Sequence, residues 1–116
     1  MRYLLAIILN FSLGIFASHA FASSTKLVHV ETAKVCMVTN KVFPTAQIPV
    51  LIEGKTYYGC CEMCKGQLEE KPQVRMALDP VSKESIDKST SYIGADKQGR
   101  VYYFKNKQNF QKFVGK

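Results

Sequence analysis

Three cysteines within five residues constrain this chain more than any other feature. The stretch from residue 57 to residue 68 reads YYGCCEMCKGQL, which places Cys60, Cys61 and Cys64 close together, and the fourth cysteine is Cys36. Four sulfurs in a chain of 116 residues can hold a metal ion, form disulfides or act as a redox couple. The compartment of the protein and the spacing of the cysteines bear on which of these uses applies.

The N-terminus predicts export. Residues 1–22 contain one arginine, an apolar stretch interrupted at Asn10 and Ser12, and the small residues Ala20 and Ala22 near the end. These are features of a secretory signal peptide that is cut after Ala22. The interruptions leave an apolar run that is shorter than the roughly 20 residues a membrane-spanning helix needs. We therefore expect a periplasmic or secreted protein that does not span the membrane after processing.

The chain is basic, with 16 lysine and arginine residues against 9 acidic ones. Such a balance can indicate binding to nucleic acid or to an anionic membrane. Here the lysines are scattered, and only Arg75 and Arg100 remain once the leader is removed. We expect a solvated, lysine-rich surface and no nucleic-acid partner.

The pattern after the leader predicts a knuckle, a hairpin and a short helix. Residues 23–34 form a polar lead-in with one short strand. Residues 47–59 have β-branched and aromatic residues on both sides of Gly54, which predicts two strands joined by a tight turn. Residues 61–70 lack β-branched residues and precede Pro72, which predicts a short helix that ends there.

The same order of elements follows in residues 79–116, with strands around a turn at residues 96–99 and a helix-like tail. Aligning the two halves with an offset of about 45 residues indicates an internal duplication. The alignment sets Ser82, Lys105 and Asn109 opposite Cys36, Cys60 and Cys64, so the second copy has lost every sulfur. Its aromatic residues are expected to cover the apolar side of the first copy: Tyr102, Phe104, Phe110 and Phe113.

Geometry leaves two disulfide arrangements open. A bond between the neighbours Cys60 and Cys61 would be strained, since their Cα atoms are about 3.8 Å apart. Cys36 can then pair with Cys60 while Cys61 pairs with Cys64, or Cys36 can pair with Cys61 while Cys60 pairs with Cys64. Export favours such disulfides in a small protein.

The spacing favours a metal site instead. Residues four apart lie on one face of a helix, so Cys60 and Cys64 can face one ion if the helix begins near Cys60. Cys36, on a knuckle before the hairpin, would supply the third thiolate. Cys61 and Met37 are additional candidate ligands. A redox use of Cys61 and Cys64 would require a thioredoxin-like fold around them, which this short chain lacks. The sequence also contains no pair of residues suited to act as a catalytic acid and base, so we do not expect an enzyme.

These residues resemble two related families. Cys36 followed by Met37, a spacer with a glycine turn, a Tyr-Tyr pair and the C-x3-C of Cys60 and Cys64 resembles the TRASH domain, which is associated with heavy-metal trafficking, resistance and sensing. The later residues Asp79-Pro80-Val81 and Tyr102-Tyr103-Phe104 resemble the YHS domain without its cysteines.

The resemblance implies a small α+β fold of two tandem zinc-ribbon or treble-clef-like modules, each a β-hairpin with a short helix. Residues 35–78 would form the TRASH-like module and residues 79–116 the degenerate YHS-like module. It implies metal binding by Cys36, Cys60 and Cys64. Thr39 stands where related four-cysteine knuckles have a second cysteine, so three thiolates are expected to hold a soft ion, Cu(I) or Zn(II).

The expected function is to bind a soft heavy metal for trafficking, buffering or resistance in the cell envelope. The partners expected are the metal ion and a metal transporter or metallochaperone of the envelope. The alternative is a disulfide-stapled structural or partner-binding domain without metal.

Overall fold

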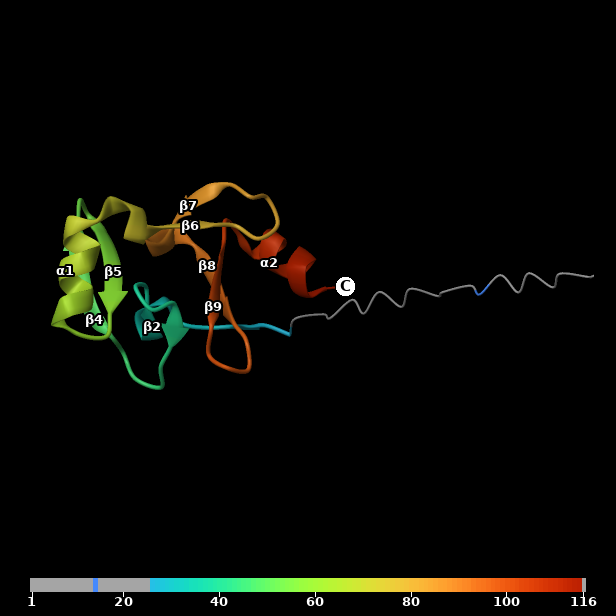
Figure 1. Cartoon of the computed structure of the whole chain (residues 1–116), viewed down its shortest axis with the longest axis horizontal. Coiled ribbons are helices and arrows are strands. Elements are labelled where there is room, and N and C mark those ends of the chain that lie inside the picture. The colour runs from blue at the N-terminus through green and yellow to red at the C-terminus, as the bar shows by residue number, and fades with distance from the viewer. Residues whose placement is uncertain (1–13, 15–25, 116) are drawn as a thin grey trace, which may run out of the picture.

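The computed structural model describes residue 14 and residues 26–115, so the expected signal peptide lies outside the described part. The fold is mixed α+β, as expected, and consists of short antiparallel strand pairs and two helices (Figure 1). The first half comprises these elements: β1 (Val28–His29), β2 (Val35–Cys36), β3 (Lys41–Val42), β4 (Ile48–Ile52), β5 (Lys55–Gly59) and α1 (Glu62–Glu70). The second half comprises β6 (Met76–Leu78), β7 (Ser85–Asp87), β8 (Tyr92–Ala95), β9 (Val101–Phe104) and α2 (Lys107–Val114). Short 3-10 turns connect them: Thr32–Lys34, Pro72–Arg75 and Lys88–Thr90.

Local chemistry explains the β4–β5 hairpin. Its two-residue turn consists of Glu53 and Gly54, whose φ angles are 51° and 76°. Two successive left-handed residues give the turn whose twist matches that of the flanking strands. The register pairs Ile52 with Lys55 and Ile48 with Gly59. The predicted hairpin is confirmed.

The knuckle is the short β2–β3 pair that carries Cys36. Cys36 pairs with Lys41, and the Asn40 amide donates a hydrogen bond of 2.8 Å to the Cys36 carbonyl. Asn40 has a φ of 57°, a left-handed conformation that asparagine tolerates better than most residues. The chain therefore reverses sharply just after Cys36.

The β6–β7 pair of the second half contains a reversal of the same form. The Lys83 amide donates to the Asp79 carbonyl at 2.9 Å, and Lys83 has a φ of 62°. Asp79 thus takes the place that Cys36 has in the knuckle. The sequence alignment had set Ser82 there, and it was wrong by three residues because the lengths of the connecting segments differ between the halves.

Both helices begin in the same way. The N-cap residues are Cys61 for α1 and Asn106 for α2, with φ and ψ of −157° and 172° in the first and −157° and 173° in the second. The Asn106 side chain accepts a hydrogen bond from the Asn109 amide, whereas Cys61 makes no such cap. The predicted helices are confirmed, and α1 begins one residue later than expected.

One hydrophobic core spans both halves. The side chains that form it are buried and come from each hairpin, from the knuckle and from α1. They are Val35, Met37, Val50, Tyr57, Leu68, Ile93, Ala95, Val101 and Tyr103. Each half alone would leave one side of this cluster open to water, so the halves stabilise each other by shared burial.

Most of the aromatic residues of the second half pack within that half. Phe104 contacts Phe110 and Phe113 of α2, with ring centroids 5.5 Å apart in both pairs, and Tyr102 lies 6.1 Å from Phe113. The expectation that these four rings cover the first half is therefore wrong. Of the aromatic residues of the second half, Tyr103 is the one that belongs to the shared core. Side chains alternate between the two faces of a strand, so Tyr103 and Val101 lie on the same face of β9 and both face this core.

Backbone hydrogen bonds fix the knuckle between the two hairpins (Figure 1). On one side the Met37 amide donates to the Tyr58 carbonyl of β5 at 2.9 Å. On the other side the Val42 amide donates to the Gly99 carbonyl at 2.9 Å, and the Val101 amide of β9 donates to the Asn40 carbonyl at 3.0 Å. The position of Cys36 therefore depends on both halves.

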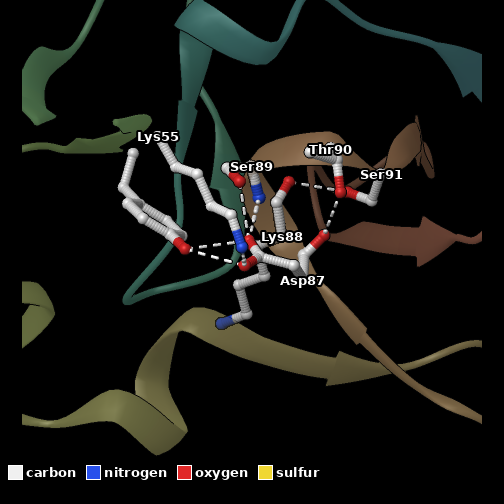
Figure 2. A network of polar contacts seen from close by, with 7 residues as sticks. Lys55, Asp87, Lys88, Ser89, Thr90 and Ser91 are labelled. Atoms are coloured by element: carbon white, nitrogen blue, oxygen red, sulfur yellow. Dashed lines mark hydrogen bonds and ion pairs between the residues drawn. The ribbon is translucent and has the colours of Figure 1, made fainter. Parts of the chain in front are cut away.

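Asp87 forms a second junction between the halves (Figure 2). Its carboxylate accepts hydrogen bonds from the Tyr57 hydroxyl at 2.9 Å and the Lys55 ammonium at 3.0 Å, both on β5. It also accepts from the hydroxyl of Ser89 at 2.7 Å and from the Ser89 amide at 2.9 Å. Strand β5 leads directly to Cys60, so this network also steadies the start of the cysteine cluster.

Among residues 26–115, no helix has both the length and the apolar character needed to cross a membrane.

Candidate metal centre

Three sulfurs converge between β2, β5 and α1. The Sγ atoms of Cys36, Cys60 and Cys64 all lie within 4.8 Å of one another. Cys36 Sγ is 3.9 Å from Cys64 Sγ, and Cys60 Sγ is 3.5 Å from Cys64 Sγ. Cys36 and Cys64 are buried, whereas Cys60 is exposed. The cluster therefore has one closed side and one side open to solvent.

The local geometry differs from the arrangement that the sequence predicted. Cys60 and Cys64 are not stacked on one helix face, because α1 begins at Glu62 and Cys60 lies before the N-cap residue. The extended conformation of Cys61 turns the chain, so that Cys60 approaches from the end of β5 and Cys64 from the first turn of α1. The two sulfurs meet through this strand-to-helix turn.

Two of the three sulfur separations are close to those around a bound ion. Zn(II)–thiolate bonds of about 2.3 Å keep tetrahedral ligand sulfurs about 3.8 Å apart and planar trigonal ones about 4 Å apart. The 3.5 and 3.9 Å separations given above fall near both values. Thiolates suit soft or borderline ions. The three cysteines could therefore hold a metal ion with little movement of the backbone.

The environment of Cys36 favours its thiolate form. Burial alone would raise the pKa of Cys36, but hydrogen bonds from the side chain and amide of Thr39, and from the amides of Val38 and Cys60, lower it from 9.0 to about 7. Val38 and Thr39 lie in the tight reversal after Cys36, and Cys60 follows β5. Thr39, which stands where a four-cysteine pattern would have a second cysteine, thus lowers the pKa of Cys36.

Cys64 has the opposite character. Burial and the neighbouring sulfurs of Cys60, Cys61 and Cys36 raise the pKa of Cys64 from 9.0 to about 12. The crowding of three sulfurs makes a second and a third thiolate costly when no cation is present. A cation at their centre would remove that cost and displace the protons, so binding would release protons.

The additional candidates Cys61 and Met37 lie in different surroundings. Cys61 Sγ is 3.5 Å from Cys64 Sγ but does not belong to the group of three sulfurs, and the side chain is exposed. Met37 is fully buried and belongs to the hydrophobic core. His29 does not belong to the group: its ring stacks on Tyr92 at 4.1 Å and forms a hydrogen bond with the Ile93 carbonyl.

Gly59 allows the close approach of strand and helix. A Cβ atom at this position would lie 3.0 Å from Cys64 Cβ and 3.4 Å from the backbone of Cys64 and Lys65. Side chains do not tolerate such contacts without movement. The glycine therefore permits Cys64 to sit against the end of β5.

Lys88 was not predicted from the sequence. Its ammonium donates to the Met37 carbonyl at 2.6 Å and to Asn40 Oδ1 at 3.1 Å, and it lies 5.1 Å from the centre of the Tyr103 ring. Burial lowers the pKa of Lys88 to about 8, while the charge of Cys36 acts in the other direction. No feature of the sequence distinguishes this lysine from the many others.

The second half places hydrogen-bonding groups where the first half has sulfurs. Asp79, which corresponds to Cys36, is fully buried. Its carboxylate accepts from the Lys105 amide at 2.7 Å and from Asn109 Nδ2 at 2.9 Å. Lys105 and Asn109 precede and follow the N-cap of α2 as Cys60 and Cys64 do in α1. Direct hydrogen bonds therefore connect the β6–β7 reversal to the start of α2 without an ion.

Comparisons of the chain with protein-family models, curated proteins and solved structures found no match.

Proposed function

We propose that this chain is an exported protein that binds a soft heavy-metal ion, Cu(I) or Zn(II), through Cys36, Cys60 and Cys64. The observation that carries the proposal is the approach of three Sγ atoms to within 4.8 Å of one another, from β2, from the residue after β5 and from the first turn of α1. In the proposed role the protein carries out no reaction. It holds the ion for trafficking, buffering or resistance in the cell envelope.

The partly open geometry supports reversible binding. Cys60 and Cys61 are exposed, so an incoming ligand can reach the ion beside Cys60 while Cys36 and Cys64 hold it from the buried side. Three thiolates also leave a coordination position that the chain does not fill with a fourth sulfur of the same group. A transporter or metallochaperone of the envelope is the proposed partner for such an exchange.

We also propose that the chain consists of a TRASH-like metal module and a YHS-like structural module. The matching reversals at Cys36 and Asp79 and the matching N-caps of α1 and α2 support a tandem origin. In this proposal the second module lost its metal and kept its shape, because the hydrogen bonds of Asp79 replaced the metal–sulfur bonds.

The test is an anaerobic titration of the reduced mature protein, residues 23–116, with Cu(I) and with Zn(II) in competition with a chromophoric chelator. We expect one ion per chain, and a loss of high-affinity binding in Cys36→Ser and in Cys64→Ser. Cys61→Ser is the matched control, since it removes an equally close thiol outside the group and should bind nearly as the wild type does. The absence of a stoichiometric complex, or equal affinity in all three variants, would contradict the proposal.

The alternative function is a disulfide-stapled domain that binds a partner without metal. The Cys60–Cys64 and Cys61–Cys64 sulfur separations of 3.5 Å favour it, because they are short enough for oxidation to join either pair in an oxidising compartment. Counting free thiols in protein taken directly from its native envelope distinguishes the two functions. Four free or metal-protected thiols exclude the stapled domain, and two disulfides exclude the metal site.

A further inference from the structure

Lys88 is a buried cation without a carboxylate partner. Asp79 and Lys88 are the charged side chains that are buried among residues 26–115, and Lys88 is 5% exposed. Within those residues the Lys88 ammonium forms no ion pair, and its hydrogen-bond partners are the neutral oxygens of Met37 and Asn40. A buried charge is costly unless an opposite charge compensates it.

The neighbouring Asp87 does not provide that charge. Its carboxylate is occupied by Lys55, Tyr57 and Ser89, and Figure 2 shows the Lys88 side chain leading away from this network. Lys88 is the first residue of the 3-10 turn Lys88–Thr90, and its side chain extends into the first half. There it reaches the carbonyl of Met37, the residue that follows Cys36.

A negative charge that could compensate Lys88 would form when the cysteine cluster binds an ion. Three thiolates around Zn(II) leave one uncompensated negative charge, and three around Cu(I) leave two. The cluster is closed by protein on the side of Cys36, where water cannot screen that charge fully. Lys88 binds the carbonyl of Met37, the residue next to the buried Cys36.

We propose that Lys88 is the counter-ion of the metal–thiolate complex, a positioning residue that the second half contributes to the site of the first. This inference rests on the proposed function. The ammonium stabilises the loaded, anionic site by its charge, and it holds the knuckle through Met37 and Asn40. The sulfur-free half of the chain thereby takes part in metal binding without providing a ligand.

The experiment compares the reduced mature wild type with Lys88→Met, Lys88→Gln and Lys107→Met. Methionine matches the length of lysine without its charge, and glutamine keeps a hydrogen-bond donor, so Lys88→Gln carries the test if Lys88→Met does not fold. Lys107 is exposed on α2 and provides the control for removing one positive charge. The readouts are the Cu(I) and Zn(II) affinities and the Tm of the metal-free and the Zn(II)-loaded protein.

We expect both Lys88 variants to bind Zn(II) about 10- to 100-fold more weakly than the wild type, the range typical of residues that support metal ligands. The loss should be larger for Cu(I), whose complex carries more negative charge. The Tm of the loaded protein should fall by more than that of the metal-free protein. Lys107→Met should leave both affinities within about twofold, since an exposed charge is screened by solvent.

Three results would overturn the inference. Wild-type affinity in Lys88→Gln would show that the charge is not needed. An equal loss for both ions, with equal decreases in the two Tm values, would show that Lys88 only supports the fold. If the wild type binds neither ion, the proposed function fails, and this inference fails with it.

Discussion

Replacing Asp87 with asparagine should destabilise the fold by an amount that depends on pH. Asp87 lies at the end of β7 and joins the second half to β5, through Lys55 and Tyr57 (Figure 2). Asparagine keeps the size of the side chain but loses its charge and one acceptor. The perturbation therefore removes the charge-assisted part of the junction while the surrounding packing stays the same.

The magnitude follows from the pKa of Asp87. Burial alone would raise this pKa, but hydrogen bonds from Ser89, Lys55 and Tyr57 lower it from 3.8 to about 2. At about 1.36 kcal/mol per pKa unit, this difference corresponds to about 2 kcal/mol of stability. Because the folded state has the lower pKa, the contribution is complete above pH 3.8 and is lost as the pH falls through about 2.

The assay is urea unfolding of the metal-free, reduced protein at several pH values between neutral and pH 2. At pH 7 we expect Asp87→Asn to be less stable than the wild type by about 2 kcal/mol, and the difference to shrink below pH 3.8 until little of it remains at pH 2. The matched control is Glu84→Gln, which removes an ion pair of similar length, 2.9 Å, whose two side chains are 54% and 55% exposed. It should cost less than about 1 kcal/mol. A difference between Asp87→Asn and the wild type that does not change with pH would refute the reasoning.

Two further substitutions test the packing around the cysteine cluster and around Asp79. Gly59→Ala would place a methyl group 3.0 Å from Cys64 Cβ, so we expect a loss of about 1–3 kcal/mol in urea unfolding and weaker metal binding. The control is Gly66→Ala on the neighbouring helix α1, where an added Cβ meets nothing within 4 Å, and it should instead stabilise the protein by about 0.5–1 kcal/mol. Asp79→Ala would leave four donors without their acceptor, those of Val81, Ser82, Lys105 and Asn109. We expect Asp79→Ala to lower the free energy of unfolding by about 3 kcal/mol or more, measured by thermal or urea unfolding. A variant as stable as the wild type would show that the hydrogen bonds of Asp79 do not stabilise this part of the second half.

Much of the local structure was predictable because short-range chemistry determines it. The glycine turn at Gly54, the helix that ends before Pro72 and the strand Val101–Phe104 follow from conformational preferences of neighbouring residues. The small pairs β2–β3 and β6–β7 were not predicted as strands. They have two or three residues on each strand, too few to show an alternating pattern.

The sequence predicted which residues form the candidate site better than it predicted how they are arranged. The spacing pointed to Cys36, Cys60 and Cys64 as the group, and the structure brings their sulfurs together. The way in which the sulfurs come together differs from the prediction, because α1 begins after Cys60 and Cys64 can approach β5 only because residue 59 is a glycine. A difference of one residue in a helix start changes which side chains share a face, and sequence patterns do not fix helix ends that closely.

The sequence by itself determined the positions of the cysteines, the turn that folds the β4–β5 hairpin and the absence of cysteine from the second half. Only the tertiary structure decided how Cys36 approaches the other two sulfurs, that Asp79 and not Ser82 stands in its place in the second half, and that Lys88 reaches the knuckle. The first group depends on the identities of residues and on dihedral preferences, which act within a few positions. The second group depends on the burial of one core shared by both halves. Exclusion of water from this core brings together residues that are far apart in the sequence, and no local sequence pattern indicates which residues meet.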